Sequence, residues 1–349
     1  MGRTMKTKWG VLGSGGIARR RTIPEGITKA SNAELVGVYD TNRVVNDEVA
    51  RDFGAKACES EDDLLSSGCD IVYIASPNSF HCAQARRAAQ SGKHVLCEKP
   101  LGMTVYEAEL IINACALHKV KLGIGFMMRF HAQHQEALKI VREGRLGKPV
   151  FARAQLSCWY PQMAGAWRQD PVLGGGGSLI DMGSHCIDLL EMFFGPVRRV
   201  FCTTGCLVQS YEAEDTALAL LEFADGAKGV VDSLFNVPDE SSKNRLELYG
   251  SYGSILAEGT IGQGEIGEMT ACLQESVKGY EANQTRESGK GVRIAPPPVN
   301  MYRAEVEAFA EAVLQDRDPP VDGAAGLRSQ RVMAACYESA REGRPIYLD

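Results

Sequence analysis

The chain has 349 residues, more than one hydrophobic core usually holds, so we expect two domains. Its formal net charge of -6 argues against nucleic acid or an anionic membrane surface as the main partner. Nowhere do about 18 apolar residues run together, and no apolar run follows the basic start, so neither a membrane span nor a secretory signal is predicted. We therefore expect a cytoplasmic protein that acts on a small molecule.

The eleven cysteines are scattered along the chain and contain no Cys-x-x-Cys pair. This pattern is typical of reduced, mostly buried thiols, and it argues against a disulfide framework or a zinc site. No metal is predicted.

A glycine-rich turn follows the first predicted strand, 8–12, and a helical stretch to about residue 30 comes after it. A strand, a G-x-G-x-x-A turn and a helix in this order are typical of a site that holds a dinucleotide's pyrophosphate at a helix N-terminus. We expect Gly13 to make the tight turn, Gly15 to let the phosphates approach, and Ala18 to let helix and strand pack. The predicted cofactor contacts of this turn are Gly13, Gly15, Gly16, Ile17 and Ala18.

An acidic residue, Asp40, ends the second predicted strand, 35–39. An acid at this distance beyond the turn is expected to accept hydrogen bonds from the adenine ribose hydroxyls and to repel a 2'-phosphate. NAD is therefore favoured, although the nearby Arg43 keeps NADP open. The alternative interpretation is that Asp40 caps a helix over 44–53.

Strands alternate with helices through the rest of the first domain. Apolar strands are predicted over 70–75, 94–97 and 121–126, and helices over 79–91 and 104–119. This alternation predicts a Rossmann-type, doubly wound parallel sheet, in which ligands bind beyond the carboxyl ends of the strands. The polar residues that follow those ends, and that we predict to contact cofactor or substrate, are Ser76, Asn78, His81, Glu98, Lys99 and Arg129.

Lys99 directly follows a buried strand and precedes a proline that restricts the backbone. Three tasks are open to its ammonium group: to bind a substrate oxygen, to bind a cofactor phosphate, or to face solvent. Position in the sequence does not decide among them.

From about residue 131 the pattern changes to one helix, which ends near 144, and then to a series of strands. These strands are predicted over 150–156, 197–207, 215–223, 228–232 and 245–249. Hairpin turns at 225–226 and 250–253 indicate that they are mostly antiparallel. Edge strands or a loop are expected over 260–300, and two helices over 302–314 and 324–341.

We therefore predict an α/β protein with two domains. The first is a Rossmann dinucleotide-binding domain over 1–127, with a doubly wound parallel sheet. The second is an α+β domain over 128–349, with an open, mostly antiparallel sheet, for substrate binding and oligomerisation. An open sheet with one face uncovered favours self-association.

The segment from Gly174 to Asp188 is the hardest to explain as plain structure. Its four consecutive glycines let the backbone bend sharply or approach a ligand closely. A buried helix follows, ended by Gly195. Asp181 and His185 are four positions apart in that helix, so both would point the same way and form an acid–base pair near neutral pH. The alternative is that Asp181 caps the helix and His185 is a core histidine.

Trp167 and Arg168 lie just before the glycines. An aromatic face beside a guanidinium group suits a polyol or the nicotinamide end of a cofactor. The alternative is a loop tryptophan that packs on its neighbours.

Three motifs, in this order and at these distances, resemble the glucose-fructose oxidoreductase, inositol dehydrogenase and MocA family: Gly13-x-Gly15-x-x-Ala18, Glu98-Lys99-Pro100 and Asp181-x-x-x-His185. The resemblance covers nearly the whole chain. It implies a Rossmann domain followed by an α/β domain with a large open sheet, assembled as a homodimer or homotetramer.

The resemblance also implies an activity. Members oxidise a secondary hydroxyl of a sugar or cyclitol with NAD or NADP, or carry out the reverse reduction. In family terms Lys99, Asp181 and His185 carry over as the catalytic residues, and the turn glycines and Asp40 as cofactor contacts.

Two other functions on the same fold stay open. A sugar-sensing regulator would bind NAD without an acid and base, and the presence of Lys99, Asp181 and His185 argues against it. A glycosidase that uses bound NAD transiently would keep similar residues, and would release sugar from a glycoside without a net change in NADH.

Overall fold

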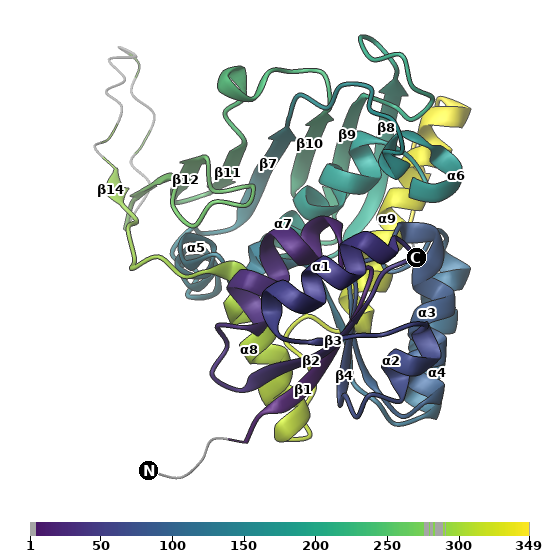
Figure 1. Ribbon diagram of the computed structural model, residues 1–349. Coiled ribbons are helices and arrows are strands. Elements are labelled where there is room, and N and C mark those ends of the chain that lie inside the picture. The colour runs from purple at the N-terminus through teal and green to yellow at the C-terminus, as the bar shows by residue number, and fades with distance from the viewer. Residues whose placement is uncertain (1–4, 276–278, 280–281, 283–288, 290, 349) are drawn as a thin grey trace. The chain divides into compact units, whose positions relative to one another are not determined.

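The computed structural model describes residues 5–275, 279, 282, 289 and 291–348. Contacts divide the chain into two compact units. The first is made of Met1–Met127, Gly165–Gly176 and Asn300–Ala334, and the second of Met128–Ala164, Gly177–Val299 and Ala335–Asp349. Two segments of the first unit thus lie beyond residue 127, where the sequence pattern placed a single boundary. Each unit contains one β-sheet (Figure 1).

The first unit contains a six-stranded sheet whose strands all run parallel. The strand order β3-β2-β1-β4-β5-β6 confirms the predicted doubly wound sheet. All four residues of β4 are buried, as expected for a parallel sheet covered on both faces. The strands are β1 Thr7–Leu12, β2 Ala33–Tyr39, β3 Lys56–Ala57, β4 Ile71–Ile74, β5 His94–Cys97 and β6 Leu122–Ile124.

A helix from the end of the chain completes the core of this sheet. Helix α8, Met301–Leu314, packs against the helical segment η1, Ala18–Ile27, on one side of the sheet (Figure 1). Phe309 of α8 meets the ring of Trp9 edge to face, with ring centroids 6.1 Å apart, and both side chains are buried. The segment Asn300–Ala334 therefore shares a hydrophobic core with the first strand.

The helical stretch after the glycine turn is confirmed, but its hydrogen bonds are π-type over Ala18–Ile27. Pro24 lies inside it and has no N–H to donate, and the N–H of Thr28 reaches back 3.0 Å to the carbonyl of Ile23, five residues earlier. This unit also contains α1 Arg43–Phe53, α2 Glu61–Leu65, α3 Asn78–Gln90, α4 Val105–Leu117, the short α6 Pro171–Gly174 and the first part of α9, Gly323–Glu342.

The second unit contains a nine-stranded sheet in the order β14-β13-β12-β11-β7-β10-β9-β8-β15. Neighbouring strands are antiparallel, as predicted, except that β7 and β10 run parallel. That pair is parallel because the chain crosses from β7 through helix α7, Ser184–Phe194, to β8. The antiparallel run β8-β9-β10 then brings β10 beside β7. The predicted strands appear as β7 Pro149–Ser157, β8 Val197–Gly205, β9 Thr216–Phe223, β10 Lys228–Leu234 and β11 Arg245–Gly250.

Four further strands extend this sheet at its two edges. They are β12 Gly253–Glu258, β13 Glu268–Leu273, β14 Val292–Arg293 and β15 Ile346–Tyr347. The strands β13 and β14 fall in the range 260–300, where edge strands or a loop were expected, and part of that range lies outside the described residues. The closing helices are α8 and α9, Gly323–Glu342, close to their predicted bounds.

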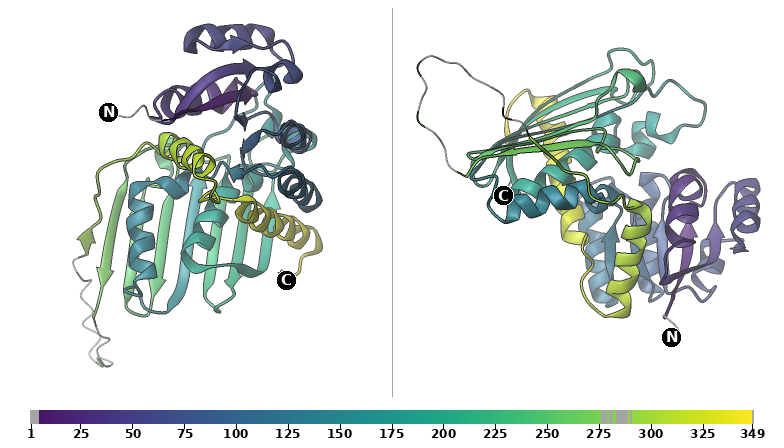
Figure 2. Two further views of the ribbon diagram at one scale, coloured as in Figure 1. Left: turned by 90° about the horizontal axis from the view of Figure 1, so that it is seen from below. Right: turned by 90° about the vertical axis from the view of Figure 1, so that its left-hand side faces the viewer.

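One face of the nine-stranded sheet carries helices α5, Ala132–Arg142, and α7 (Figure 2). The other face presents apolar side chains to solvent: Leu218 and Leu220 of β9 and Leu256 of β12 are 49, 56 and 42% exposed. Across the described residues, no helix combines the length and apolar character needed to cross a membrane.

Candidate active site

The glycine turn after β1 is shaped by close packing on one side and open space on the other. Gly13 has a φ of +76°, and a Cβ there would lie 2.4 Å from the backbone nitrogen of Ser76, so no larger residue fits. Gly16 has a φ of +48°, with nothing within 4 Å of the place of a Cβ. Helical structure begins at Gly16, and Ala18 is buried beneath it. An open glycine at a helix N-terminus fits a dinucleotide's pyrophosphate.

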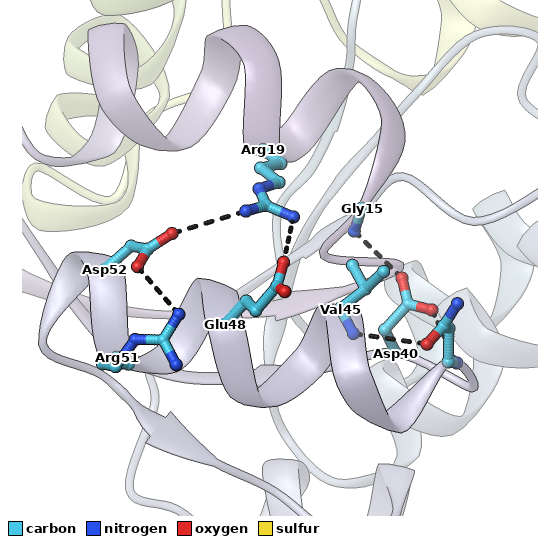
Figure 3. Close-up of polar contacts among 8 residues, drawn as sticks. Gly15, Arg19, Asp40, Val45, Glu48, Arg51 and Asp52 are labelled. Carbon is cyan, nitrogen blue, oxygen red and sulfur yellow. Dashed lines mark hydrogen bonds and ion pairs between the residues drawn. The ribbon is translucent and has the colours of Figure 1, made fainter.

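Asp40, directly after β2, holds this turn in place (Figure 3). One carboxylate oxygen accepts a 2.9 Å hydrogen bond from the Gly15 N–H, and the other accepts one of 2.9 Å from the Asn42 N–H. The cap of α1 is Asn42, whose side chain accepts from the Val45 N–H, so Asp40 does not cap that helix. A carboxylate has about four acceptor positions, so capacity for ribose hydroxyls remains.

The cations near the end of β2 are engaged by acids. Arg19 lies 2.8 Å from a carboxylate oxygen of Glu48 and 3.4 Å from one of Asp52 (Figure 3). Arg43 is highly exposed and forms a 3.6 Å pair with Glu59. These carboxylates compete for the guanidinium groups that a 2'-phosphate would need.

The residues predicted at the end of β4 use their side chains within the first unit. The hydroxyl of Ser76 donates to the side chain of Gln84 at 2.6 Å. The amide of Asn78 donates to the carbonyl of Gly174 at 2.7 Å, and both Ser76 and Asn78 are buried. Asn78 therefore ties the first turn of α3 to the start of the glycine run.

His81 spans two loops of the site. Its ring is fully buried, with Nε2 3.0 Å from the carbonyl oxygen of Ser76 and Nδ1 2.8 Å from that of Pro100. Burial lowers the pKa of His81, while the two carbonyl contacts act in the opposite direction. The ring thus links the loop after β4 to the loop after β5.

Lys99 follows Glu98, whose carboxylate is held by a tyrosine of the neighbouring strand β4. One Glu98 oxygen accepts a 2.6 Å hydrogen bond from the Tyr73 hydroxyl, and the other accepts one of 3.3 Å from the Lys99 N–H. The hydroxyl of Thr22 lies 3.0 Å from that of Tyr73. Burial raises the pKa of Glu98 and, more strongly, that of Tyr73.

Both neighbours of Lys99 in the chain are therefore held by hydrogen bonds. Tyr73 holds the side chain of Glu98, and His81 contacts the carbonyl of Pro100. Sequence reasoning missed Tyr73. The available signal was a hydroxyl inside an otherwise apolar strand, since a buried tyrosine O–H needs a partner.

Trp167 and Arg168 form a stacked pair in the first unit. The guanidinium carbon of Arg168 lies 4.1 Å from the centre of the Trp167 ring, in the short helix η3, Trp167–Gln169. The backbone of this pair lies against Gly174, where a Cβ would be 3.2 Å from the Trp167 carbonyl oxygen. Asn78, just after β4, donates to the Gly174 carbonyl, so the pair lies near the loop after β4.

In the second unit, the last glycine of the run packs against the backbone of a distant segment of the chain. A Cβ at Gly177 would lie 2.0 Å from the carbonyl oxygen of Glu214, so the backbone that passes close to this glycine belongs to Glu214 and not to a ligand. Gly175 and Gly176, with φ of +82° and +155°, make the bend before it. Sequence reasoning missed Glu214. Its only signal was an acidic pair, 214–215, ahead of a predicted strand.

Asp181 and His185 lie in one continuous helical segment, made of the π-helical η4, Leu179–Gly183, and α7. Asp181 is half-buried and His185 is buried. Asp181 lies inside η4 rather than at its start, so it is not the helix cap. The helix ends at Gly195, with a φ of +84°, as predicted.

Arg129 braces the same helix. Its Nε and Nη2 donate to the two carboxylate oxygens of Asp188 at 2.7 and 2.6 Å, and Asp188 is buried. Two parallel bonds of this kind fix both groups in one geometry. Asp188 follows His185 by about one helical turn, so Arg129 also helps to hold the histidine's helix.

The structure therefore gathers the predicted residues in two sets. The first unit holds the turn glycines, Asp40, Ser76, Asn78, His81, Glu98, Lys99, Trp167 and Arg168, and the second holds Arg129, Asp181 and His185. Among the described residues, no group of three or more histidine, cysteine or acidic side chains is placed to hold a metal ion.

Comparisons with known proteins show the family of the chain. Residues 7–126 match the sequence profile of the oxidoreductase family with an NAD-binding Rossmann fold, and residues 134–256 match the GFO/IDH/MocA C-terminal domain. A D-xylose 1-dehydrogenase (NADP(+)) of Haloferax volcanii is 31% identical, over 98% of this chain and 99% of its own. The chain belongs to the GFO/IDH/MocA family of oxidoreductases.

Two further proteins are similar over nearly the whole chain. A 1,5-anhydro-D-fructose reductase of Ensifer adhaerens is 27% identical over 98% of both chains. The crystal structure of the aldose-aldose oxidoreductase of Caulobacter crescentus, complexed with glycerol, is 29% identical and superposes with a TM-score of 0.86, over 98% of this chain and all of its own.

Proposed function

We propose that this oxidoreductase transfers a hydride between a nicotinamide cofactor and a secondary hydroxyl or ketone of a sugar, sugar derivative or cyclitol. The observation that carries the proposal is that the phosphate-binding turn and the anchored Lys99 lie at the same carboxyl edge of one parallel sheet. The sugar-converting relatives support the substrate class.

Each catalytic residue has a stated task in this proposal. When bound, the nicotinamide supplies the hydride chemistry. In the oxidation direction His185 takes the proton of the substrate hydroxyl as general base. Lys99 hydrogen-bonds the same oxygen and stabilises its developing negative charge. Asp181 orients the histidine or the lysine.

A substrate panel tests the function. The protein is incubated with inositols, aldoses and sugar derivatives, each with NAD and with NADP, and the absorbance of the reduced cofactor is followed. We expect turnover of at least one neutral polyol or aldose. No turnover of any hydroxyl compound would contradict the proposal. Release of sugar from a glycoside without net NADH would instead indicate the glycosidase alternative.

For the cofactor, we propose that NAD is preferred over NADP because of Asp40, although two related D-xylose 1-dehydrogenases are named for NADP(+). Asp40→Ser is expected to lower the NAD-to-NADP ratio of kcat/KM about fivefold or more, since repulsion between two charges near a surface costs about 1–4 kcal/mol. It should also weaken NAD binding, because the Gly15 N–H loses its acceptor. Asp40→Asn, which keeps an acceptor oxygen, should change the ratio while binding NAD better than Asp40→Ser.

The control for this prediction is Glu34→Ser. Glu34 is an exposed acid near the start of β2, at the opposite end of that strand from Asp40, and its loss should leave the cofactor ratio unchanged. Both cofactors are compared by steady-state kinetics. Native turnover with NADP that equals or exceeds turnover with NAD would overturn the assignment to Asp40.

We also propose that the protein assembles as a homodimer or homotetramer through the open face of the nine-stranded sheet. The exposed leucines of that face, Leu218, Leu220 and Leu256, support this, because apolar patches on a sheet face favour association. Sedimentation should give a mass of two or four chains, and Leu220→Lys should lower it. A monomer mass for the native protein at micromolar concentration would contradict the proposal.

A cytoplasmic location belongs to the same proposal. All eleven cysteines are free thiols, which suits a reducing compartment. Fractionation of cells that express the protein tests it.

A further inference from the structure

The start of the helical segment that carries Asp181 and His185 is hydrogen-bonded to a residue that is distant in the sequence. The first N–H groups of a helix have no partner within the helix. Here the N–H groups of Gly177 and Leu179 donate to the two carboxylate oxygens of Glu214, at 2.7 and 3.0 Å. The N–H between them, of Ser178, donates to the backbone carbonyl of Glu214 at 2.9 Å. One residue thus receives three successive amides.

Glu214 is itself held firmly. The hydroxyl of Tyr337 donates to its Oε1 at 2.9 Å. The next residue, Asp215, accepts hydrogen bonds from three backbone N–H groups, of Leu207, Val208 and Gln209, at 2.9, 2.7 and 2.8 Å. The backbone on either side of the contact is therefore fixed, and Gly177 has no room to move toward Glu214.

The charge of Glu214 suits its place. A carboxylate at a helix N-terminus interacts favourably with the helix dipole. Burial raises the pKa of Glu214, while the bonds from Leu179, Tyr337 and Gly177 act in the opposite direction. Four hydrogen bonds to one residue, from two distant segments, determine where the helical segment starts and how it is rotated.

We propose that Glu214, braced by Tyr337, is a positioning residue that sets the place of Asp181 and His185 for proton transfer. The inference rests on the proposed function of His185. Glu214 would act through the helix and not by contact with the reacting atoms.

The test compares Glu214→Ala, Glu214→Gln and Tyr337→Phe. A displacement of about 1 Å can cost about 100-fold in rate, so Glu214→Ala should lower kcat by about that factor. Glu214→Gln keeps one of the two acceptor oxygens and should lose less, and Tyr337→Phe least. The dissociation constant of NAD should stay within about twofold of native, because the phosphate turn belongs to the first unit.

Glu191→Ala is a matched control at the other end of the same helix. The Glu191 carboxylate is buried and accepts a 2.9 Å hydrogen bond from the Val197 N–H, beyond the helix C-terminus. Its loss should lower the melting temperature while kcat per folded molecule is retained. An equal loss of kcat in Glu191→Ala and Glu214→Ala would show that general destabilisation is the cause, and would overturn the proposal.

A double variant separates this inference from the proposed function. If Glu214 acts through His185, adding Glu214→Ala to His185→Ala should lower the remaining rate by only a small factor. The same loss in both backgrounds, or a fast Glu214→Ala together with a fast Glu214→Gln, would overturn the positioning role and leave the proposed function standing. A fully active His185→Ala would refute the proposed function as well.

Discussion

Replacing His185 with alanine is expected to lower kcat by about 100- to 10,000-fold, the range that general acid–base catalysis contributes. A general base accepts a proton only in its deprotonated form, so the native oxidation rate should rise with pH as that base loses its proton, and the variant should lose this dependence. The competing explanation is a core histidine, since the side chain is buried. In that case His185→Ala would melt at a lower temperature while its folded fraction stayed active.

His134→Ala is the control for a core histidine. The His134 ring is fully buried in the same unit, 2.8 Å from the Met128 carbonyl through Nδ1, and burial lowers its pKa to about 3. His134 is therefore neutral throughout the working range and does not produce a near-neutral transition. Its variant should lose stability and keep both kcat per folded molecule and the native pH profile.

Burial also lowers the pKa of His81, His94 and His131. These rings therefore lose their proton at a lower pH than a free imidazole does. Asp181→Asn should be intermediate, because it keeps the shape and loses the charge that favours a protonated imidazole. Two measurements on His185→Ala, His134→Ala and Asp181→Asn distinguish a general base from a core histidine: the pH dependence of the rate, and the melting temperature. An active His185→Ala with an unchanged pH profile would remove His185 from the mechanism.

Lys99→Ala is expected to lower kcat by about 100- to 1,000-fold and to change NAD affinity little. Removing one preorganised donor at a developing oxyanion has a cost of that size, and the interaction strengthens only in the transition state. If Lys99 instead binds a cofactor phosphate, NAD binding should weaken while turnover at saturating NAD stays near native. The NAD dissociation constant by calorimetry and kcat at saturating NAD distinguish the two roles.

The chain offers a matched lysine for this experiment. Lys93 stands just before β5, at the opposite end of the strand from Lys99, and its ammonium donates to the Cys69 carbonyl at 2.9 Å. Lys93→Ala removes a positive charge and one hydrogen bond from the same sheet, and should leave kcat and NAD affinity unchanged. A drop in kcat of similar size in Lys93→Ala and Lys99→Ala would point to a structural effect rather than catalysis.

The sequence by itself determined the local elements and the class of the first sheet. Short apolar runs such as 71–74 alternate with segments of helical periodicity, and this alternation predicted the parallel strands. The G-x-G-x-x-A pattern predicted the turn after the first strand. Gly195 marked the helix end, and 225–226 marked the β9–β10 hairpin. These features were predictable because periodicity and turn chemistry depend on neighbours within one or two turns of the chain.

Only the tertiary structure decided which groups hold the site residues. Glu214 binds Gly177 across 37 positions and Tyr337 across 123, Asp40 braces Gly15 across 25, and the parallel pairing of β7 with β10 follows from a crossover. Polar side chains have no period that reports their partner. The sequence shows that a residue is acidic, but not whether its carboxylate binds a ribose, caps a helix or holds a glycine turn. The packing of segments that are distant in the sequence determines which of these roles it has.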